Sequence, residues 1–303
     1  MKNKKTLIIG GTGFLGYHLA LHLIKRNDKV TSISLRKPRK YRKIKKVKYL
    51  VGDISKKKIL SSLLLKRKFD YIINFGGYVD HSNNRSIYKT HYLGTKNLYE
   101  IFKNKNIKSF IQIGSSSEYG NLKSPHYEKQ NGKPNTLYGQ SKLKSTNFLL
   151  DKSKKYNFPV TIVRLYQVYG PKQDNNRFIP QLIQSCINKK KFLTSSGNQF
   201  RDFLYVDDVI RGIILCTKTK KSHGKIINLG NGRPIQLKKI MKIAKKEIKY
   251  FNPIFGKLKL RKGELKSIFP SIKLAKKTVK WKARLNFTKG FKKTIKYYKK
   301  EIR

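Results

Sequence analysis

The chain has 303 residues, of which 38% are hydrophobic and 12% aromatic, enough to fill the core of a folded protein of one or two domains and to exclude a disordered chain. Its 72 Lys and Arg residues against 15 Asp and Glu give a formal net charge of +57 at pH 7, so the surface attracts polyanions in general. The basic residues run through the whole chain and form neither a tail nor an arm. We therefore interpret them as a compositional bias of the genome rather than a dedicated nucleic-acid surface, and we expect no specific nucleic-acid partner.

Cysteine usage and hydropathy exclude two further classes. Cys186 and Cys216 lie far apart and outside any Cys/His cluster, which indicates two buried thiols and neither a disulfide framework nor a metal site. No apolar run approaches the roughly 18 residues of a membrane-spanning helix, so no transmembrane anchoring is expected. The first apolar run is also too short for a signal peptide. We expect a cytoplasmic protein; a loose electrostatic association with acidic membrane stays open.

In the first half of the chain, short β-rich runs alternate with segments of helical periodicity. The predicted strands are 6–9, 30–35, 47–51, 71–75, 110–113 and 160–165, and the predicted helices are 14–25, 59–65, 88–103 and 137–155. Continuous apolar strands separated by helices are typical of a parallel sheet that is covered on both faces. The sequence therefore predicts an α/β fold with a Rossmann-type, doubly wound parallel sheet.

Beyond about residue 170 this alternation loosens. A polar loop over 170–177 precedes a predicted helix around 178–189, and the elements that follow are short and separated by glycine-containing turns. This pattern predicts a dinucleotide-binding domain over 1–170 and a smaller C-terminal α/β substrate lobe over 171–303, with some exchange of strands and helices between them. No repeat or linker separates the two, so we expect them to be packed together.

A glycine motif marks the cofactor site. Gly10, Gly13 and Gly16 directly follow the first predicted strand and open the first predicted helix. In such a loop one glycine permits the tight turn, the next lets backbone N–H groups approach a pyrophosphate, and the third lets helix and strand pack closely. The N-terminus of the helix adds partial positive charge. We assign the cofactor to this loop, including Thr12, Phe14 and Leu15.

The end of the second strand distinguishes NAD from NADP. A carboxylate there would accept the ribose hydroxyls of NAD, but the sequence places Ser34 at this position and Arg36 just beyond it. Because Arg36 can pair with a 2′-phosphate, NADP is favoured over NAD; the alternative is that Arg36 is one more surface charge. Asp53 and Ile54, after the third strand, are expected beside the adenine.

Two further segments carry candidate chemistry. Tyr138 and Lys142 lie four residues apart at the start of a predicted helix, so they share one face. A nearby ammonium favours the phenolate, so we expect Lys142 to lower the pKa of Tyr138 toward the working range. Ser115 ends a predicted strand at the edge where ligands of open α/β sheets bind, and it is expected to hydrogen-bond the same substrate oxygen as Tyr138.

Together these motifs resemble those of the extended short-chain dehydrogenase/reductase family, which contains nucleotide-sugar epimerases, dehydratases and ketoreductases. The matching stretches are 10–16, 52–53, 115–120, 138–142, 164–171, 201–209 and 261–264. The resemblance implies that NAD(P) and a nucleoside diphosphate sugar bind, and that hydride moves at a sugar carbon, usually C4. Ser115 and Tyr138 would then be catalytic, supported by Lys142. Tyr138 and Lys142 are also expected to contact the cofactor, with Lys142 reaching a ribose hydroxyl.

The resemblance also implies binding residues outside the catalytic group. Phe75, Gly76 and Gly77 would line the cofactor, and Ser116 and Gln167 the sugar. Arg201 and Arg261 would bind the diphosphate, a role that suits a planar guanidinium. The alternative for Arg201 is a structural ion pair with Asp202 or Asp207.

Departures from the family pattern bear on the reaction. Glu118 could act as the proton-abstracting glutamate of a sugar 4,6-dehydratase only if the turn absorbs a one-residue deletion. His91 replaces a common asparagine, and His81 lies in a segment vaguely similar to a dehydratase motif. We therefore favour a 4-ketoreductase or a 4-epimerase, with a 4,6-dehydratase as an alternative.

An alternative from another class is a non-catalytic, polyanion-binding member of the fold, supported by the charge of +57 alone. Relatives often pair through the two long helices beside the sheet, so a homodimer through 88–103 and 137–155 is expected by resemblance.

Overall fold

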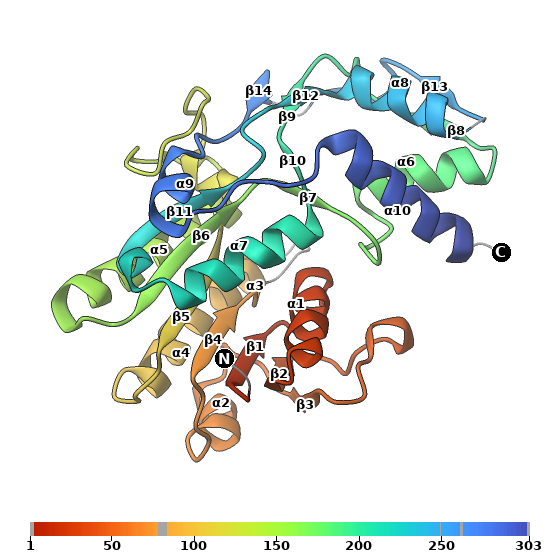
Figure 1. Cartoon of the computed structure of the whole chain (residues 1–303). Helices are drawn as coiled ribbons and strands as arrows, with labels where there is room; N and C mark the ends of the chain where they lie inside the picture. The colour runs from red at the N-terminus through yellow and green to blue at the C-terminus, as the bar shows by residue number, and fades with distance from the viewer. Residues whose placement is uncertain (1–2, 78–83, 249, 261–262, 302–303) are drawn as a thin grey trace.

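The computed structural model describes residues 3–77, 84–248, 250–260 and 263–301 (Figure 1). Its centre is a seven-stranded parallel sheet in the order β11-β6-β5-β4-β1-β2-β3. The strands are β1 (Lys5–Ile9), β2 (Lys29–Ser34), β3 (Lys48–Val51), β4 (Tyr71–Asn74), β5 (Ser109–Ser115), β6 (Val160–Leu165) and β11 (Lys225–Leu229). The strand order reverses at β1, as in a doubly wound sheet, and the predicted fold class is confirmed.

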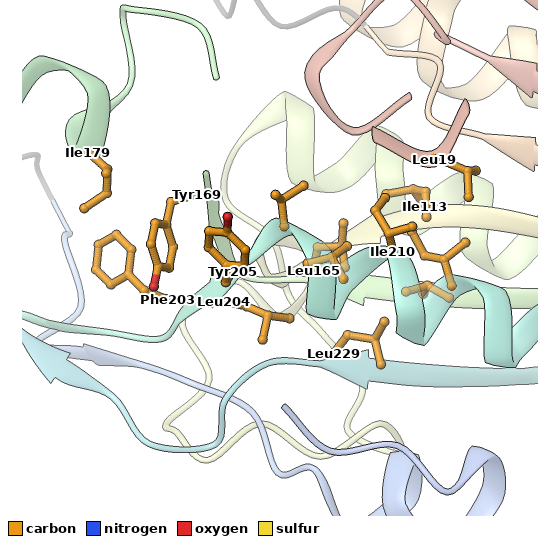
Figure 2. Packing of buried hydrophobic residues seen from close by; sticks show 14 of the residues in the cluster. Leu19, Ile113, Leu165, Tyr169, Ile179, Phe203, Leu204, Tyr205, Ile210 and Leu229 are labelled. Atoms are coloured by element: carbon orange, nitrogen blue, oxygen red, sulfur yellow. The ribbon is translucent and has the colours of Figure 1, made fainter. Parts of the chain in front are cut away.

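Helices cover both faces of the sheet, because the strands are apolar on both sides. One face packs against α1 (Phe14–Lys25) and α7 (Val206–Lys218), and the other against α2 (Lys57–Leu64), α4 (Gly94–Phe102) and α5 (Leu137–Tyr156). Figure 2 shows Ile210 of α7 among Leu19, Ile113 and Leu165. Each such fully buried aliphatic side chain stabilises the fold by about 1.5–3 kcal/mol.

The last strand of the sheet comes from the second half of the chain. β11 pairs in parallel with β6, and Asn228 lies in register with Arg164. The helix α7, also beyond residue 170, packs against β5 and β6. Elements of the second half of the chain therefore complete the central sheet.

The helix predicted over 88–103 has three parts. These are α3 (Asn84–Tyr88), a π-helical turn, η2 (Lys89–Leu93), and α4. The backbone carbonyl of His91 in this turn accepts hydrogen bonds from Thr95 Oγ1 and Ser145 Oγ, both at 2.7 Å. Single π-helical turns frequently occur at functional sites, and this one brings His91 beneath α5.

The C-terminal lobe consists mostly of short elements beside the carboxyl edge of the sheet. They are β7 (Gln167–Tyr169), α6 (Phe178–Ile187), β8 (Lys191–Leu193), β9 (Phe200–Arg201), β10 (Phe203–Tyr205), β12 (Ile235–Gln236), α8 (Leu237–Glu247), β13 (Asn252–Ile254), β14 (Ser267–Ile268), α9 (Lys273–Val279) and α10 (Phe287–Glu301). Short 3₁₀ turns occur at η1 (Lys40–Arg42), η3 (Ser116–Tyr119) and η4 (Lys220–Ser222). In Figure 1 the C-terminal α10 lies beside α6.

One core anchors the lobe to the sheet. Trp281 is fully buried, and its Nε1 donates a hydrogen bond to the backbone oxygen of Asp208 on α7 at 3.0 Å. The Asp208 carboxylate in turn accepts the backbone N–H groups of Arg284 and Leu285, each at 2.9 Å. Within the described ranges, no helix is long and apolar enough to cross a membrane.

Candidate active site

The glycine loop lies at the carboxyl end of β1, where the chain turns into α1. Gly10 has φ +77°, a conformation that favours glycine, and its N–H donates to the Ile33 oxygen at 2.8 Å. A Cβ added to Gly16 would lie 2.3 Å from the Gly10 oxygen and 2.5 Å from the Gly11 Cα. The third glycine therefore allows α1 to rest directly on the loop, as the motif predicts.

This loop fits the pyrophosphate of a dinucleotide. Gly13 is the N-cap of α1 and no side chain caps the helix, so the first-turn N–H groups and the positive end of the helix dipole face the loop. Thr12, Phe14 and Leu15 lie here, as expected from the sequence. A Cβ on Gly10 would contact the Phe75 backbone at 3.3 Å, so the loop and the segment after β4 share one site.

The flanking cofactor candidates surround this loop. Ile54 is buried, and a Cβ on Gly76 would lie 2.8 Å from its Cδ1. Asp53 Oδ1 accepts the N–H of Ser55 at 2.8 Å, a turn that holds the carboxylate at the end of β3. Ser34 ends β2 and its Oγ accepts the Thr12 N–H at 3.4 Å, whereas Arg36 is exposed beyond it.

The catalytic candidates converge from β5 and α5. Ser115 is the last residue of β5, and Tyr138 lies in the first turn of α5, whose N-cap Thr136 accepts the Gly139 N–H at 3.1 Å. A hydrogen bond joins the Tyr138 and Ser115 side chains. One turn further, Lys142 Nζ lies 5.9 Å from the centroid of the Tyr138 ring and donates to the Ile113 oxygen at 2.8 Å.

The protonation of this group differs from the sequence-based expectation. Burial raises the pKa of Tyr138, and the hydrogen bond with Ser115 opposes the rise without overcoming it. Burial also lowers the pKa of Lys142, to about 8. The expectation that Lys142 lowers the pKa of Tyr138 is therefore wrong for this structure, because desolvation of the phenol dominates. Tyr138 is held as a neutral phenol, which can donate a proton.

Glu118 points into the protein core and away from the crevice. Its side chain is 0% exposed, and its Oε2 accepts from Arg164 Nε at 2.9 Å, Arg164 Nη2 at 2.8 Å and Thr146 Oγ1 at 2.8 Å. Oε1 accepts the Ser115 N–H at 2.8 Å, while Ser115 Oγ accepts the Ser117 N–H at 3.1 Å. This reciprocal capping box shapes the η3 turn that contains Ser116.

His91 contacts the catalytic candidate Tyr138. The sequence analysis noted His91 only as a departure from the family pattern. Its imidazole is 3% exposed and packs edge-on against Tyr138, with ring centroids 5.1 Å apart and planes at 82°. On its other side lies Gly77, where a Cβ would be 2.2 Å from His91 Cε1. This contact depends on the π-helical turn. Sequence periodicity does not distinguish such a turn from an α-helix, so the contact could not be predicted from the periodicity.

The predicted substrate residues are placed only in part. Arg201 on β9 is buried, and its Nη2 lies 2.6 Å from Glu264 Oε1. Its ion-pair partner is thus Glu264, and the alternative pairing with Asp202 or Asp207 is wrong. Asp202 instead accepts the backbone N–H groups of Asn231 and Gly232 at 2.7 Å.

The structure describes only some of the other predicted substrate residues. Gln167 begins β7 and is exposed. Arg261, and His81 with the segment around it, lie outside the described residues. The described part of the chain contains no group of three or more His, Cys, Asp or Glu side chains that could hold a metal ion.

A protein-family model matches most of the chain. The model of the NAD dependent epimerase/dehydratase family matches residues 6–230. The chain belongs to this family, and it is therefore an enzyme of the NAD-dependent epimerase/dehydratase type.

Individual relatives carry different activities. The chain is 30% identical over 271 residues to a dTDP-D-glucose 4,6-dehydratase of Dictyostelium discoideum, covering 80% of this chain and 62% of that protein. It is 25% identical over 320 residues to a UDP-glucuronate 4-epimerase of Thermodesulfobacterium geofontis, covering 98% and 96%. A solved structure of a mutant UDP-glucuronic acid 4-epimerase from Bacillus cereus, in complex with UDP-4-deoxy-4-fluoro-glucuronic acid and NAD, matches with a TM-score of 0.89 and 25% identity, covering 98% of this chain and 99% of that one.

Proposed function

We propose that this enzyme transfers hydride at C4 of a nucleoside diphosphate sugar and eliminates no water, acting as a 4-ketoreductase or a 4-epimerase. The observation that carries the proposal is the hydrogen-bonded pair of Ser115 and Tyr138, with Lys142 one helical turn away, beside a dinucleotide loop. Relatives that share the fold act on nucleotide sugars, as their names state. When bound, the dinucleotide supplies or accepts the hydride.

The residues of the chain handle the proton. In the reducing direction, Tyr138 Oη donates its proton to the oxygen at C4, while Ser115 Oγ hydrogen-bonds the same oxygen as negative charge develops there. The neutral phenol of Tyr138 is suited to this donation, since burial raises its pKa. Donation leaves Tyr138 as a phenolate, which the ammonium of Lys142, one turn away, helps to stabilise. In the oxidising direction this phenolate accepts the proton of the C4 hydroxyl and returns to the neutral phenol.

A 4,6-dehydratase is the second candidate, and the similarity to the Dictyostelium dehydratase favours it. Such a reaction needs a carboxylate that takes the C5 proton. Glu118 is committed to Arg164 and Thr146, and serine occupies positions 116 and 117 of the turn. The η3 turn holds Glu118 inward and contains no other carboxylate. We therefore place this candidate second.

The test is an assay of the purified enzyme on paired 4-keto and 4-hydroxy nucleotide sugars, with Tyr138→Phe as the control. Stoichiometric loss of NAD(P)H with a 4-keto sugar identifies a ketoreductase. Exchange of C4 epimers with no net change in the cofactor identifies an epimerase. Formation of a 4-keto-6-deoxy sugar, or no turnover on any member of the panel, would contradict the proposal. The Tyr138→Phe variant should lose about 10²–10⁴-fold in kcat and still bind the cofactor.

For the cofactor we propose a preference for NADP over NAD. Ser34 ends β2 and Arg36 beyond it is exposed, available to a 2′-phosphate. The Bacillus structure carries NAD, so the preference has to be measured on this chain. We expect Arg36→Ala to weaken NADP binding about tenfold and to leave NAD binding within twofold. Equal losses for both dinucleotides would contradict the proposed role of Arg36.

For the substrate we propose that Arg201 and Arg261 bind the diphosphate, with Ser116 and Gln167 beside the sugar. The bond to Glu264 fixes the Arg201 guanidinium in one orientation. Arg201→Lys keeps the charge but loses the planar fork, so the KM for the nucleotide sugar should rise more than kcat falls.

We further propose that the enzyme is cytoplasmic, because soluble nucleotide sugars and NAD(P) occur together in that compartment. We also propose that it forms a homodimer. Pairing would use the faces of α4 and α5, where Tyr156 is 64% exposed. Light scattering of the purified enzyme tests the oligomeric state, and a monomer at all concentrations would contradict it.

A further inference from the structure

A basic pocket lies at the amino edge of the sheet, opposite the carboxyl edge where the candidate active site lies. It has a volume of about 670 Å³ and is lined where β1, β2 and β3 begin, with contributions from the end of α1 and the turn before β4. In Figure 1 these elements lie together at the bottom of the view. The basic residues that line it are Lys5, Lys29, Lys46, Lys48, Lys66, Arg67 and Lys68.

The pocket is separate from the cofactor loop. β1 runs from Lys5, which lines the pocket, to Ile9, directly before Gly10. A strand of five residues spans about 16 Å, so the two sites lie at opposite ends of the same strand. Ligands of open α/β sheets bind at the carboxyl edge, and neither the fold nor the proposed reaction assigns a role to this amino edge.

Acidic side chains do not neutralise the pocket. Asp28 is the single acidic residue of its lining; it is 6% exposed, and its Oδ1 accepts the Lys4 N–H at 3.0 Å. Nearby Asp70 pairs with Lys108 at 3.0 Å. In the described ranges, no ion pair involves any of the basic residues that line the pocket. The C-terminus of α1 contributes only about half a negative charge.

The strand register places some of these charges next to one another. Lys5 is in register with Lys29 on the neighbouring strand, and Lys48 is in register with Thr31, two residues further along β2. Like charges on adjacent strands repel and destabilise a sheet. At physiological ionic strength the screening length is about 8 Å, so neighbours on adjacent strands are not fully screened. A bound anion would relieve this repulsion.

The floor of the pocket is apolar and its rim is basic. Val30 is 3% and Phe69 9% exposed, and Ile24 is half-buried beside them, whereas the lysines are exposed. We propose that this pocket is a second binding site, for a small molecule that carries adjacent phosphate groups. Several lysines can share such a ligand, and the apolar floor leaves room for a base or another apolar part. The volume lies within the range of small-molecule pockets.

The net charge of the whole chain suggests a competing explanation, in which anions bind anywhere on the surface. Lys221, Lys225 and Lys277 provide a matched control. They are exposed, they belong to η4, β11 and α9 at the other edge of the sheet, and none of them lines the basic pocket.

The experiment compares two triple variants of equal charge. One carries Lys29→Gln, Lys48→Gln and Lys66→Gln, and the other Lys221→Gln, Lys225→Gln and Lys277→Gln; each reduces the formal charge from +57 by three, to +54. Titration calorimetry measures the Kd of inorganic tripolyphosphate and of ATP, with the glycine loop saturated by the dinucleotide. We expect the control to bind within twofold of the unmodified chain and the pocket variant at least tenfold more weakly. Thermal unfolding checks that both variants are folded.

Each outcome decides the proposal. Equal weakening in both variants, or none in the pocket variant, overturns it in favour of a diffuse charged surface. Binding of an RNA oligonucleotide without binding of either phosphate probe overturns it as well. Tighter binding of ATP than of tripolyphosphate identifies a nucleotide as the ligand, and equal binding identifies the phosphate chain alone. Dinucleotide binding and turnover should be unchanged in the pocket variant, so this test is independent of the proposed C4 chemistry.

Discussion

Glu118 and Arg164 form a buried ion pair in which one carboxylate oxygen lies 2.8 Å from Nη2 and 2.9 Å from Nε. The two side chains are 0% and 1% exposed. The other carboxylate oxygen accepts the Ser115 N–H at 2.8 Å. The ion pair therefore links the turn at Ser115 to Arg164 on β6. The acid that could have served elimination chemistry is instead part of the support of the site.

Replacing Glu118 with Gln should cost stability. The substitution leaves the Arg164 charge buried without a counter-charge, and breaking such a pair costs about 3–5 kcal/mol. Urea denaturation measures the loss. Glu118→Gln combined with Arg164→Met removes both charges and should recover most of the stability. A Glu118→Gln variant that is as stable as the unmodified chain and loses only a water-eliminating activity would instead identify Glu118 as a catalytic base.

Lys142 should lower stability at neutral pH. Burial lowers its folded-state pKa to about 8, below the usual lysine value of 10.5. Below pH 8 both states are protonated and the cost of burying the charge is present in full. Between pH 8 and 10.5 the unfolded chain binds more protons, so stability rises with pH and the cost disappears. Lys142→Met should therefore be more stable than the unmodified chain by up to about 3 kcal/mol near pH 7.

The measurement for Lys142 is the urea midpoint across this pH window. The advantage of Lys142→Met should shrink as pH rises toward 10.5. Lys144, exposed on the same helix, provides the control, and Lys144→Met should change stability little at any pH. A Lys142→Met variant that is less stable at every pH would mean that the hydrogen bond to the Ile113 oxygen outweighs the burial cost.

Local sequence patterns were sufficient for the elements that have strong local signals. The helix predicted over 14–25 has these bounds in the structure, and the convergence of Ser115 with Tyr138 follows from a strand end and a helix start that face the same edge of the sheet. These features depend on glycines, periodicity and the rule that parallel strands present their carboxyl ends together.

The features that sequence did not reveal depend on contacts between distant segments. β11 is a short apolar run like several others, and only its pairing with β6 makes it part of the sheet. The ion pairs of Glu118 with Arg164 and of Arg201 with Glu264 join residues far apart in the chain. The pKa of Tyr138 rises because of burial, a property of the assembled fold and not of the spacing to Lys142.

Gly16 and Gly13 should tolerate alanine very differently. A Cβ on Gly16 meets backbone atoms of Gly10 and Gly11 at 2.3 and 2.5 Å, which cannot move without displacing α1 from the loop. Gly16→Ala should weaken dinucleotide binding at least tenfold and lower stability by about 1–3 kcal/mol. A Cβ on Gly13 meets only the Gly10 oxygen, at 3.3 Å, so Gly13→Ala should lower stability less. Equal stability losses in both variants, measured by thermal unfolding, would contradict this account of the loop.

Gly77 should control the position of Tyr138 through His91. A Cβ at Gly77 would lie 2.2 Å from His91 Cε1, and the imidazole is 3% exposed and packed edge-on against Tyr138 at 5.1 Å. Gly77→Ala should therefore displace both rings, and since a misplacement of about 1 Å can cost about 10²-fold in rate, we expect kcat to fall by about ten- to a hundredfold. Adding His91→Ala removes the clash and should recover part of kcat, a coupling that steady-state kinetics of the two single variants and the double variant measures. If the double variant shows the losses of both single variants multiplied together, the two residues act independently and His91 does not transmit the displacement to Tyr138.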